Sequence, residues 1–192
     1  MSQLQVLLLR HSLPLFLILP LAGSLTSATY SIVGERASRR LEPLLATPVT
    51  TGELLLGKTV AVALPAVLGT WLAFAVFFGS TLVLGGVPVA TLAVDAAGWL
   101  TMLLATPGFA LFGMGAGVLV SARAKDPRAA QQIGMLLLLP IMLLLVAQIA
   151  GAFLLGPGLA IGGGAVVFVL DAALLAWGRR LFDRERLLAE WR

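Results

Sequence analysis

The sequence predicts an all-α fold, a polytopic membrane helical bundle with five transmembrane helices and short cytoplasmic amphipathic helices. Hydrophobic residues fill 59% of the 192 positions and charged residues only 11%, with a mean hydropathy of +1.02, whereas a soluble domain has roughly one quarter charged residues. Apolar runs long enough to cross a hydrocarbon core of about 30 Å recur along the chain. These runs lack the alternation of barrel strands, so they fit helices.

The apolar runs divide the chain into one transmembrane domain, residues 1–192, with a polar elbow at 34–57 and a cytoplasmic tail at 178–192. Proline inside a span should kink it, and glycines four residues apart should let two helices approach closely. The expected spans are about 13–33, 59–83, 93–120, 133–155 and 158–177. The prolines are Pro65, Pro107 and Pro140, and the glycine pairs are Gly113 with Gly117 and Gly158 with Gly162.

The basic residues predict the orientation of these spans. Twelve of the 13 Lys and Arg residues fall on one side of the membrane, and Arg10 falls on the other. By the positive-inside rule the first side is the cytoplasm, so we expect the N-terminus outside and the C-terminus inside, in the inner (plasma) membrane of a bacterial-type cell. The stretches "LGGVPVATL" and "GPG" are then uncharged outer loops. The net charge of +4 reflects this topology, and we expect lipid and no nucleic acid as a partner.

The elbow is the most polar part of the chain. Leucines at 41, 44 and 45 recur at helical spacing while acids and bases fill the other positions, which predicts a short amphipathic helix. Pro48 should stop this helix. Thr50 and Glu53 then form a capping box that starts the next helix. The elbow is therefore a helix, a turn and a second helix start at the cytoplasmic surface.

Two interpretations of the elbow compete. Its charges could be a solvated topology signal, as in many inner loops. A topology signal needs only basic residues, however, and here acids alternate with bases on a preorganised bend, which suits docking to a protein. The second inner loop is also built to begin a helix, because Asp126 can cap it and Pro127 suits its first position.

At this point the sequence resembles type 2 ABC exporter permeases. The stretch "GERASRRLEPLLATPVTTGELLLGK" carries the family's acidic-basic opening, "LE-x-LL-x-TP" and "E-x-LLGK" in order, and "SARAKDPRAAQQIGMLLLLP" and "LFDRERLL" resemble its second inner loop and C-terminal ending. The resemblance spans roughly residues 13–190. It implies a transmembrane subunit of an ATP-driven exporter of unknown substrate, in which the elbow is the coupling helix that docks on a nucleotide-binding subunit.

The resemblance also implies partners and docking residues. We expect an ABC ATP-binding subunit that holds ATP and magnesium, no cofactor in this chain, and a homodimer or heterodimer of permease subunits. Family members usually have six spans, and the first span here corresponds to their second, so we expect a truncated or split permease. The expected docking residues are Glu35, Arg36, Arg39, Arg40, Glu42, Leu44, Leu45, Thr47 and Pro48.

A literal phosphate-loop pattern occurs at "GELLLGKT", from Gly52 to Thr59. Such a loop must connect a buried strand to a helix so that its backbone can cradle phosphate. Here the pattern lies in a capped helical run that enters the membrane. We therefore predict no nucleotide site in this chain.

Inside the membrane, Asp171 is the candidate functional residue. It lies eight residues before Arg179, about 12 Å along the helix, and a charge at that depth is costly and functional by default. Gln148 is a candidate polar neighbour, and both are expected on a translocation path. Asp95, at the start of the third span, is expected to be an interfacial cap.

Other classes of function remain to be weighed. An intramembrane serine protease would need histidine within the bundle, but His11 lies at the outer edge, and no H-E-x-x-H motif is present. An aspartyl protease would need two aspartates at one depth, whereas Asp95 and Asp171 lie near opposite faces. The chain has no cysteine, which excludes disulfides and thiolate chemistry. A non-ABC membrane scaffold or channel stays open as the alternative.

Overall fold

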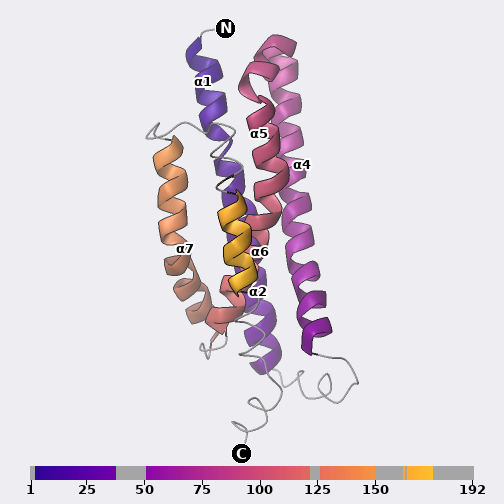
Figure 1. Cartoon of the computed structure of the whole chain (residues 1–192), viewed down its shortest axis with the longest axis vertical. Helices are drawn as coiled ribbons and strands as arrows, with labels where there is room; N and C mark the ends of the chain where they lie inside the picture. The colour runs from indigo at the N-terminus through magenta and orange to yellow at the C-terminus, as the bar shows by residue number, and fades with distance from the viewer. Residues whose placement is uncertain (1–2, 38–50, 122–125, 150–161, 163, 175–192) are drawn as a thin grey trace, which may run out of the picture.

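The computed structural model describes residues 3–37, 51–121, 126–149, 162 and 164–174, and these residues are almost entirely helical with no strand among them. The all-helical prediction is therefore confirmed for this part of the chain (Figure 1). The labelled elements are α1 (Gln3–Ser12), α2 (Leu15–Ala37), α4 (Thr51–Ala93), α5 (Ala96–Leu100), the π-helix η1 (Thr101–Ala105), α6 (Thr106–Ser121) and α7 (Pro127–Ile149). A shorter apolar helix follows at Gly164–Leu174.

The described helices support a multi-pass membrane protein. Three of them are long and apolar enough to cross a bilayer, and a bent pair in α7 makes a fourth if it counts as one span. The prediction of five spans is not confirmed, because both ends of the expected fifth span, 158–177, lie outside the described residues and its described helix, Gly164–Leu174, is shorter than a span. The polar tail, 178–192, also lies outside the described residues. The three long spans are Gln5–Ser31, Leu56–Ala93 and Ala96–Ser121.

Helix α6 lies at the centre and contacts α2, α4 and α7. Its closest contact is with α2, where a Cβ built on Gly113 would collide with the carbonyl oxygen of Leu21. One turn later, a Cβ on Gly117 would lie 2.6 Å from the Cβ of Ala28. The predicted close packing through this glycine pair is therefore confirmed. For the second pair, Gly158 is not described, and a Cβ on Gly162 would meet nothing within 4 Å.

The predicted proline kink is found at Pro140, and an irregular turn lies beside Pro107. The π-helix η1 precedes Pro107, which has no N–H for the carbonyl four residues back. The indole nitrogen of Trp71 donates to the Met102 carbonyl in this π-helix at 3.2 Å, so a side chain of α4 supplies a hydrogen bond to the backbone of the irregular turn. In α7 the two halves meet at 49° between Leu136 and Leu138, where the ring of Pro140 opposes the carbonyl four residues before it.

Helix α4 departs from prediction at two points. No break occurs at Pro65, because the one non-helical residue inside α4 is Gly86, at φ 75 and ψ 172. The segment "LGGVPVATL", expected as an outer loop, is helical on both sides of Gly86, so the expected loop conformation is wrong. A positive φ is accessible to glycine at little cost, and this one residue lets the chain turn where a longer loop was expected.

The predicted start of α7 agrees with the structure. The Asp126 carboxylate accepts from the Ala129 N–H at 3.4 Å, and α7 begins at Pro127. The predicted capping box of Thr50 and Glu53 is not tested, because Thr50 lies outside the described residues, of which Thr51 is the first in α4. The segment from Gly52 to Thr59 is helical throughout, as expected for a membrane entry and not for a phosphate loop.

Candidate functional site

The end of α2 and the start of α4 lie together at one end of the bundle (Figure 1), which we call the Lys58 end. The last turn of α2 carries the backbone of Glu35 and Arg36 to this end. The predicted elbow thus begins here. Its other docking residues lie outside the described part of the chain, namely Arg39, Arg40, Glu42, Leu44, Leu45, Thr47 and Pro48.

Asp171 lies on the face of the Gly164–Leu174 helix that packs against α6. A Cβ on Gly108 would lie 3.1 Å from a methyl of Val167, and one on Gly115 would lie 3.2 Å from the Cβ of Leu174. Positions 167, 171 and 174 share one face of a helix. The carboxyl of Asp171 is therefore enclosed between the two glycine contacts, and the residue is only 3% exposed.

Neither carboxyl oxygen of Asp171 has a hydrogen-bond partner. A buried polar group without a bond costs roughly 1–3 kcal/mol, and a charged one at the centre of a membrane helix costs about 2.5–3.5 kcal/mol. The only other buried side-chain oxygens without a partner in the described residues belong to Ser24 and Thr106. Burial of the Asp171 carboxyl therefore costs free energy at a position where packing alone would favour an apolar side chain.

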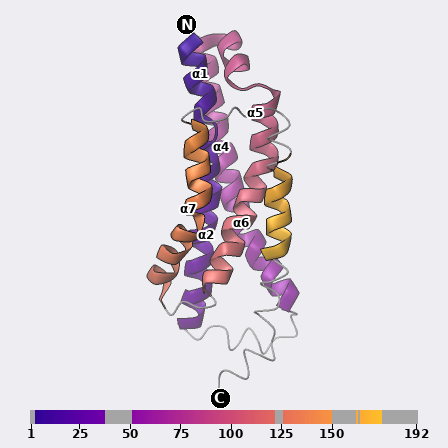
Figure 2. The same cartoon turned by 60° about the vertical axis from the view of Figure 1, so that its left-hand side comes forward.

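Gln148 is also buried, at 9% exposure near the end of α7. Figure 2 shows α7 and the Gly164–Leu174 helix on opposite sides of the bundle, with α6 between them. The structure therefore does not bring Gln148 next to Asp171. If the two residues line a path, they do so from different sides of α6.

At the opposite end of the bundle, the guanidinium of Arg10 on α1 pairs with the carboxylate of Asp95. We call this the Arg10 end. The second oxygen of Asp95 accepts from the Gly98 N–H at 2.9 Å and caps α5. The predicted cap is confirmed, and the same carboxylate also ties α1 to the start of α5.

An aromatic cluster connects α2, α4 and α5 through Phe16, Phe74, Phe77, Phe78 and Trp99. Trp99 contacts Phe74 and Phe78 in edge-on geometry, with ring centroids 5.1 and 5.2 Å apart. Phe16 joins the cluster through Phe74 at 5.9 Å and Phe77 at 5.3 Å. Edge-on aromatic pairs add stability beyond their buried area, so three helices are fixed to each other in this region.

The contact between Arg10 and Asp95 was missed by sequence reasoning. A signal for it exists, because Arg10 alone among the basic residues was assigned to the outer side and Asp95 was assigned to the outer start of the third span. Two opposite charges at one depth of a small bundle are candidates for pairing. The unpaired hydroxyls of Ser24 and Thr106 had no comparable signal, because hydroxyls in helices usually bond to their own backbone.

Comparison with models of known protein families gives a match over most of the chain. The family described as "ABC-2 family transporter protein" matches residues 2–163. No curated protein and no solved structure shows significant similarity to the chain. The matched region contains the elbow and the described helices from α2 to α7.

Proposed function

The chain belongs to the ABC-2 family of transporter proteins, and from this membership we propose that it is the membrane-spanning permease subunit of an ATP-driven exporter. The observation that carries the proposal is the family match over residues 2–163. It favours a transporter over the scaffold or channel that the sequence had left open. A separate subunit would bind and hydrolyse ATP with magnesium, and this chain would need no cofactor of its own.

In this proposal the elbow, residues 34–57, is the docking element. α2 carries Glu35 and Arg36 to the Lys58 end, and the alternating charges that follow in the sequence fit a protein surface better than anionic lipid. Because the elbow connects two membrane helices in the chain, it would transmit movement of the ATPase to the bundle. A second permease subunit, identical or related, would complete the transporter.

Co-purification tests this proposal. Charge reversal by Arg39→Glu or Glu42→Arg should release an ATPase subunit that the wild type retains, because each places like charges at the docking surface. Arg10→Gln is the matched control at the opposite end and should retain the ATPase. Absence of any ATPase in the wild-type preparation, or its retention by both reversed variants, would contradict the proposal.

The orientation can be tested separately because the chain has no cysteine. We propose that the Arg10 end faces outward and the Lys58 end faces the cytoplasm. A single cysteine at Gln5 should then react with a membrane-impermeant maleimide in intact cells, whereas one at Glu53 should react only after the membrane is opened. The reverse pattern would place the elbow outside and exclude docking to a cytoplasmic ATPase.

We also propose that Asp171 and Gln148 belong to the translocation path. Support comes from the burial of both side chains and from the unpaired carboxyl of Asp171. Asp171→Asn should change the ATP turnover of the reconstituted complex while the ATPase stays bound. Val169→Asn is the control, because Val169 lies on the exposed face of the same helix, 68% exposed. Unchanged turnover in Asp171→Asn would remove this residue from the path.

A further inference from the structure

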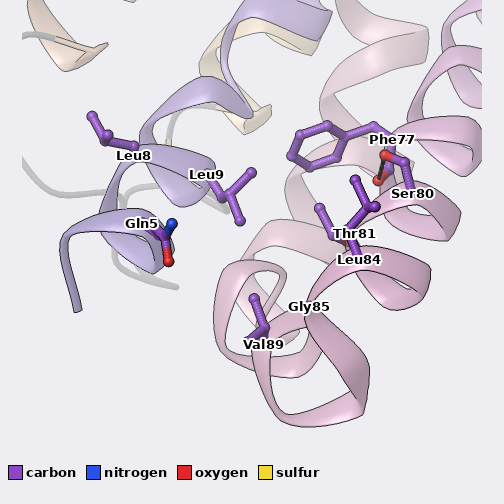
Figure 3. Close-up of a pocket in the computed structure, with 9 residues that line it drawn as sticks. All are labelled: Gln5, Leu8, Leu9, Phe77, Ser80, Thr81, Leu84, Gly85 and Val89. Carbon is purple, nitrogen blue, oxygen red and sulfur yellow. Dashed lines mark hydrogen bonds between the residues drawn. The ribbon is translucent and has the colours of Figure 1, made fainter. Parts of the chain in front are cut away.

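A pocket of about 350 Å³ lies between α1 and the far end of α4, at the Arg10 end of the bundle (Figure 3). The α1 residues form one wall and the α4 residues the other. Gly86 turns the chain, and the residues after it add the remaining side. The pocket is lined by Gln5, Leu8, Leu9, Phe77, Ser80, Thr81, Leu84, Gly85 and Val89.

The lining carries no charge, and its polar side chains are those of Gln5, Ser80 and Thr81. The hydroxyl of Ser80 donates to the Phe77 carbonyl, and that of Thr81 donates to the Phe78 carbonyl, both at 2.7 Å. Most of the remaining lining is aliphatic or aromatic. A charged ligand would lose its hydration here without meeting a charged partner, so the chemistry of the pocket favours an uncharged and largely apolar group.

The pocket opens onto apolar surface. Leu8 and Leu84 line it and are also 62% and 79% exposed on the outside of the bundle. Val83 and Val87 extend this exposed surface on both sides of Gly86. A hydrocarbon chain could therefore enter sideways from lipid without crossing a polar barrier.

One lining residue of the pocket, Phe77, is held by a contact with another helix. It contacts Phe16 of α2, with ring centroids 5.3 Å apart. On α4 the pocket begins at Phe77, about 32 Å along the helix from Leu56, against a hydrocarbon core of about 30 Å. It is thus placed at the edge of the bilayer, where lipid chains begin and head groups lie.

We propose that this pocket binds one hydrocarbon chain of an amphiphilic lipid at the Arg10 face of the membrane. Its volume is within the range of small-ligand sites, roughly 300–1,000 Å³. Binding draws on burial of methylene groups against leucine, valine and phenylalanine, while the head group stays outside the uncharged lining. The site depends only on described helices and not on the proposed export function.

A photoreactive fatty acid, a palmitate analogue with a diazirine on its chain, tests this site on the purified full chain. Adducts mapped by mass spectrometry should concentrate in the segments 3–12 and 77–89. Leu84→Asn should lower this labelling about fivefold, because a polar group at the rim disfavours apolar contact. Val83→Asn is the matched control at the neighbouring position: Val83 is 83% exposed and does not line the pocket, so labelling should not change.

A second variant tests the interior of the pocket. Val89→Trp should fill the space and reduce labelling, with thermal unfolding used to check that the chain still folds. If it does not fold, Leu84→Asn decides, because that position is largely exposed. The proposal is overturned if adducts spread evenly over lipid-exposed positions such as Leu64, Leu68 and Leu72, or if Leu84→Asn and Val83→Asn label alike.

Discussion

Two faces of α6 use glycine for different purposes. On one face, Gly113 and Gly117 bring the backbone of α6 against α2, and the contact is apolar and tight. On the other face, Gly108 and Gly115 receive the Gly164–Leu174 helix, which places the unpaired carboxyl of Asp171 between them. The first face is optimised for packing. On the second face, the buried carboxyl of Asp171 lowers stability without a packing benefit, which is typical of a functional position.

The largest effect should come from the α2 face. Gly113→Ala puts a methyl group into the Leu21 carbonyl, and neither backbone can move without separating the helices. We expect a loss of about 2–3 kcal/mol in the free energy of unfolding, as for overpacked cores. The midpoint of denaturation of the purified protein in detergent measures it.

The control for this variant is Gly23→Ala on α2, where a Cβ would meet nothing within 4 Å. Alanine favours helix over glycine by up to about 1 kcal/mol, so this variant should be neutral or slightly stabilising. Equal destabilisation by both variants would mean that the α2–α6 contact is not the reason for glycine at position 113.

On the face of α6 that contacts the Gly164–Leu174 helix, we expect a substitution to stabilise the protein. Asp171→Val removes a buried carboxyl without partners and should raise the free energy of unfolding by about 1–3 kcal/mol. ATP turnover by the complex should fall in the same variant. A loss of stability would show that Asp171 has a structural partner, and the contrast between the two faces of α6 would then fail.

A smaller effect is expected for Gly115→Ala, also on the second face. The new methyl group would approach the Cβ of Leu174 to 3.2 Å, so the helix must shift by a few tenths of an ångström. The expected loss is about 1 kcal/mol or less, because the gain in helix propensity offsets the contact. Denaturation of this variant and of Gly113→Ala under the same conditions compares the loss of unfolding free energy at the two faces of α6.

The sequence predicted the features that depend on local composition. Apolar runs gave the helices, Asp126 with Pro127 gave the start of α7, and the spacing of Gly113 and Gly117 gave a close contact. It did not predict which helix the glycines would meet, since helix pairing depends on the arrangement of the whole bundle. The helical segment around Gly86 was missed because glycine and proline usually mark loops.

The candidate site was predicted only in part. The cost of an acid among apolar residues singled out Asp171 from the sequence alone, and its burial agrees with that choice. Its assumed proximity to Gln148 is not found, because depth along a helix gives no information on which side of the bundle the helix occupies. The pocket between α1 and α4 had no sequence signal, since its lining resembles any lipid-facing surface.

The smallest effect is expected at the Arg10 end, away from both faces of α6. Asp95→Asn keeps a side chain that caps α5 well but removes the ion pair with Arg10. The two side chains are 44% and 36% exposed, so solvent screens the pair and the loss should be about 0.2–1 kcal/mol. Denaturation at low salt measures it.

The cap and the ion pair can then be separated. Asp95→Ala removes both and should cost about 1 kcal/mol more than Asp95→Asn, because Gly98 loses its acceptor. The ion-pair part alone should disappear at about 1 M salt, where screening acts over roughly 3 Å. If Asp95→Asn costs as much as Gly113→Ala and is insensitive to salt, the pair is a rigid structural element, and the tight packing of α2 on α6 is not the main support of this bundle.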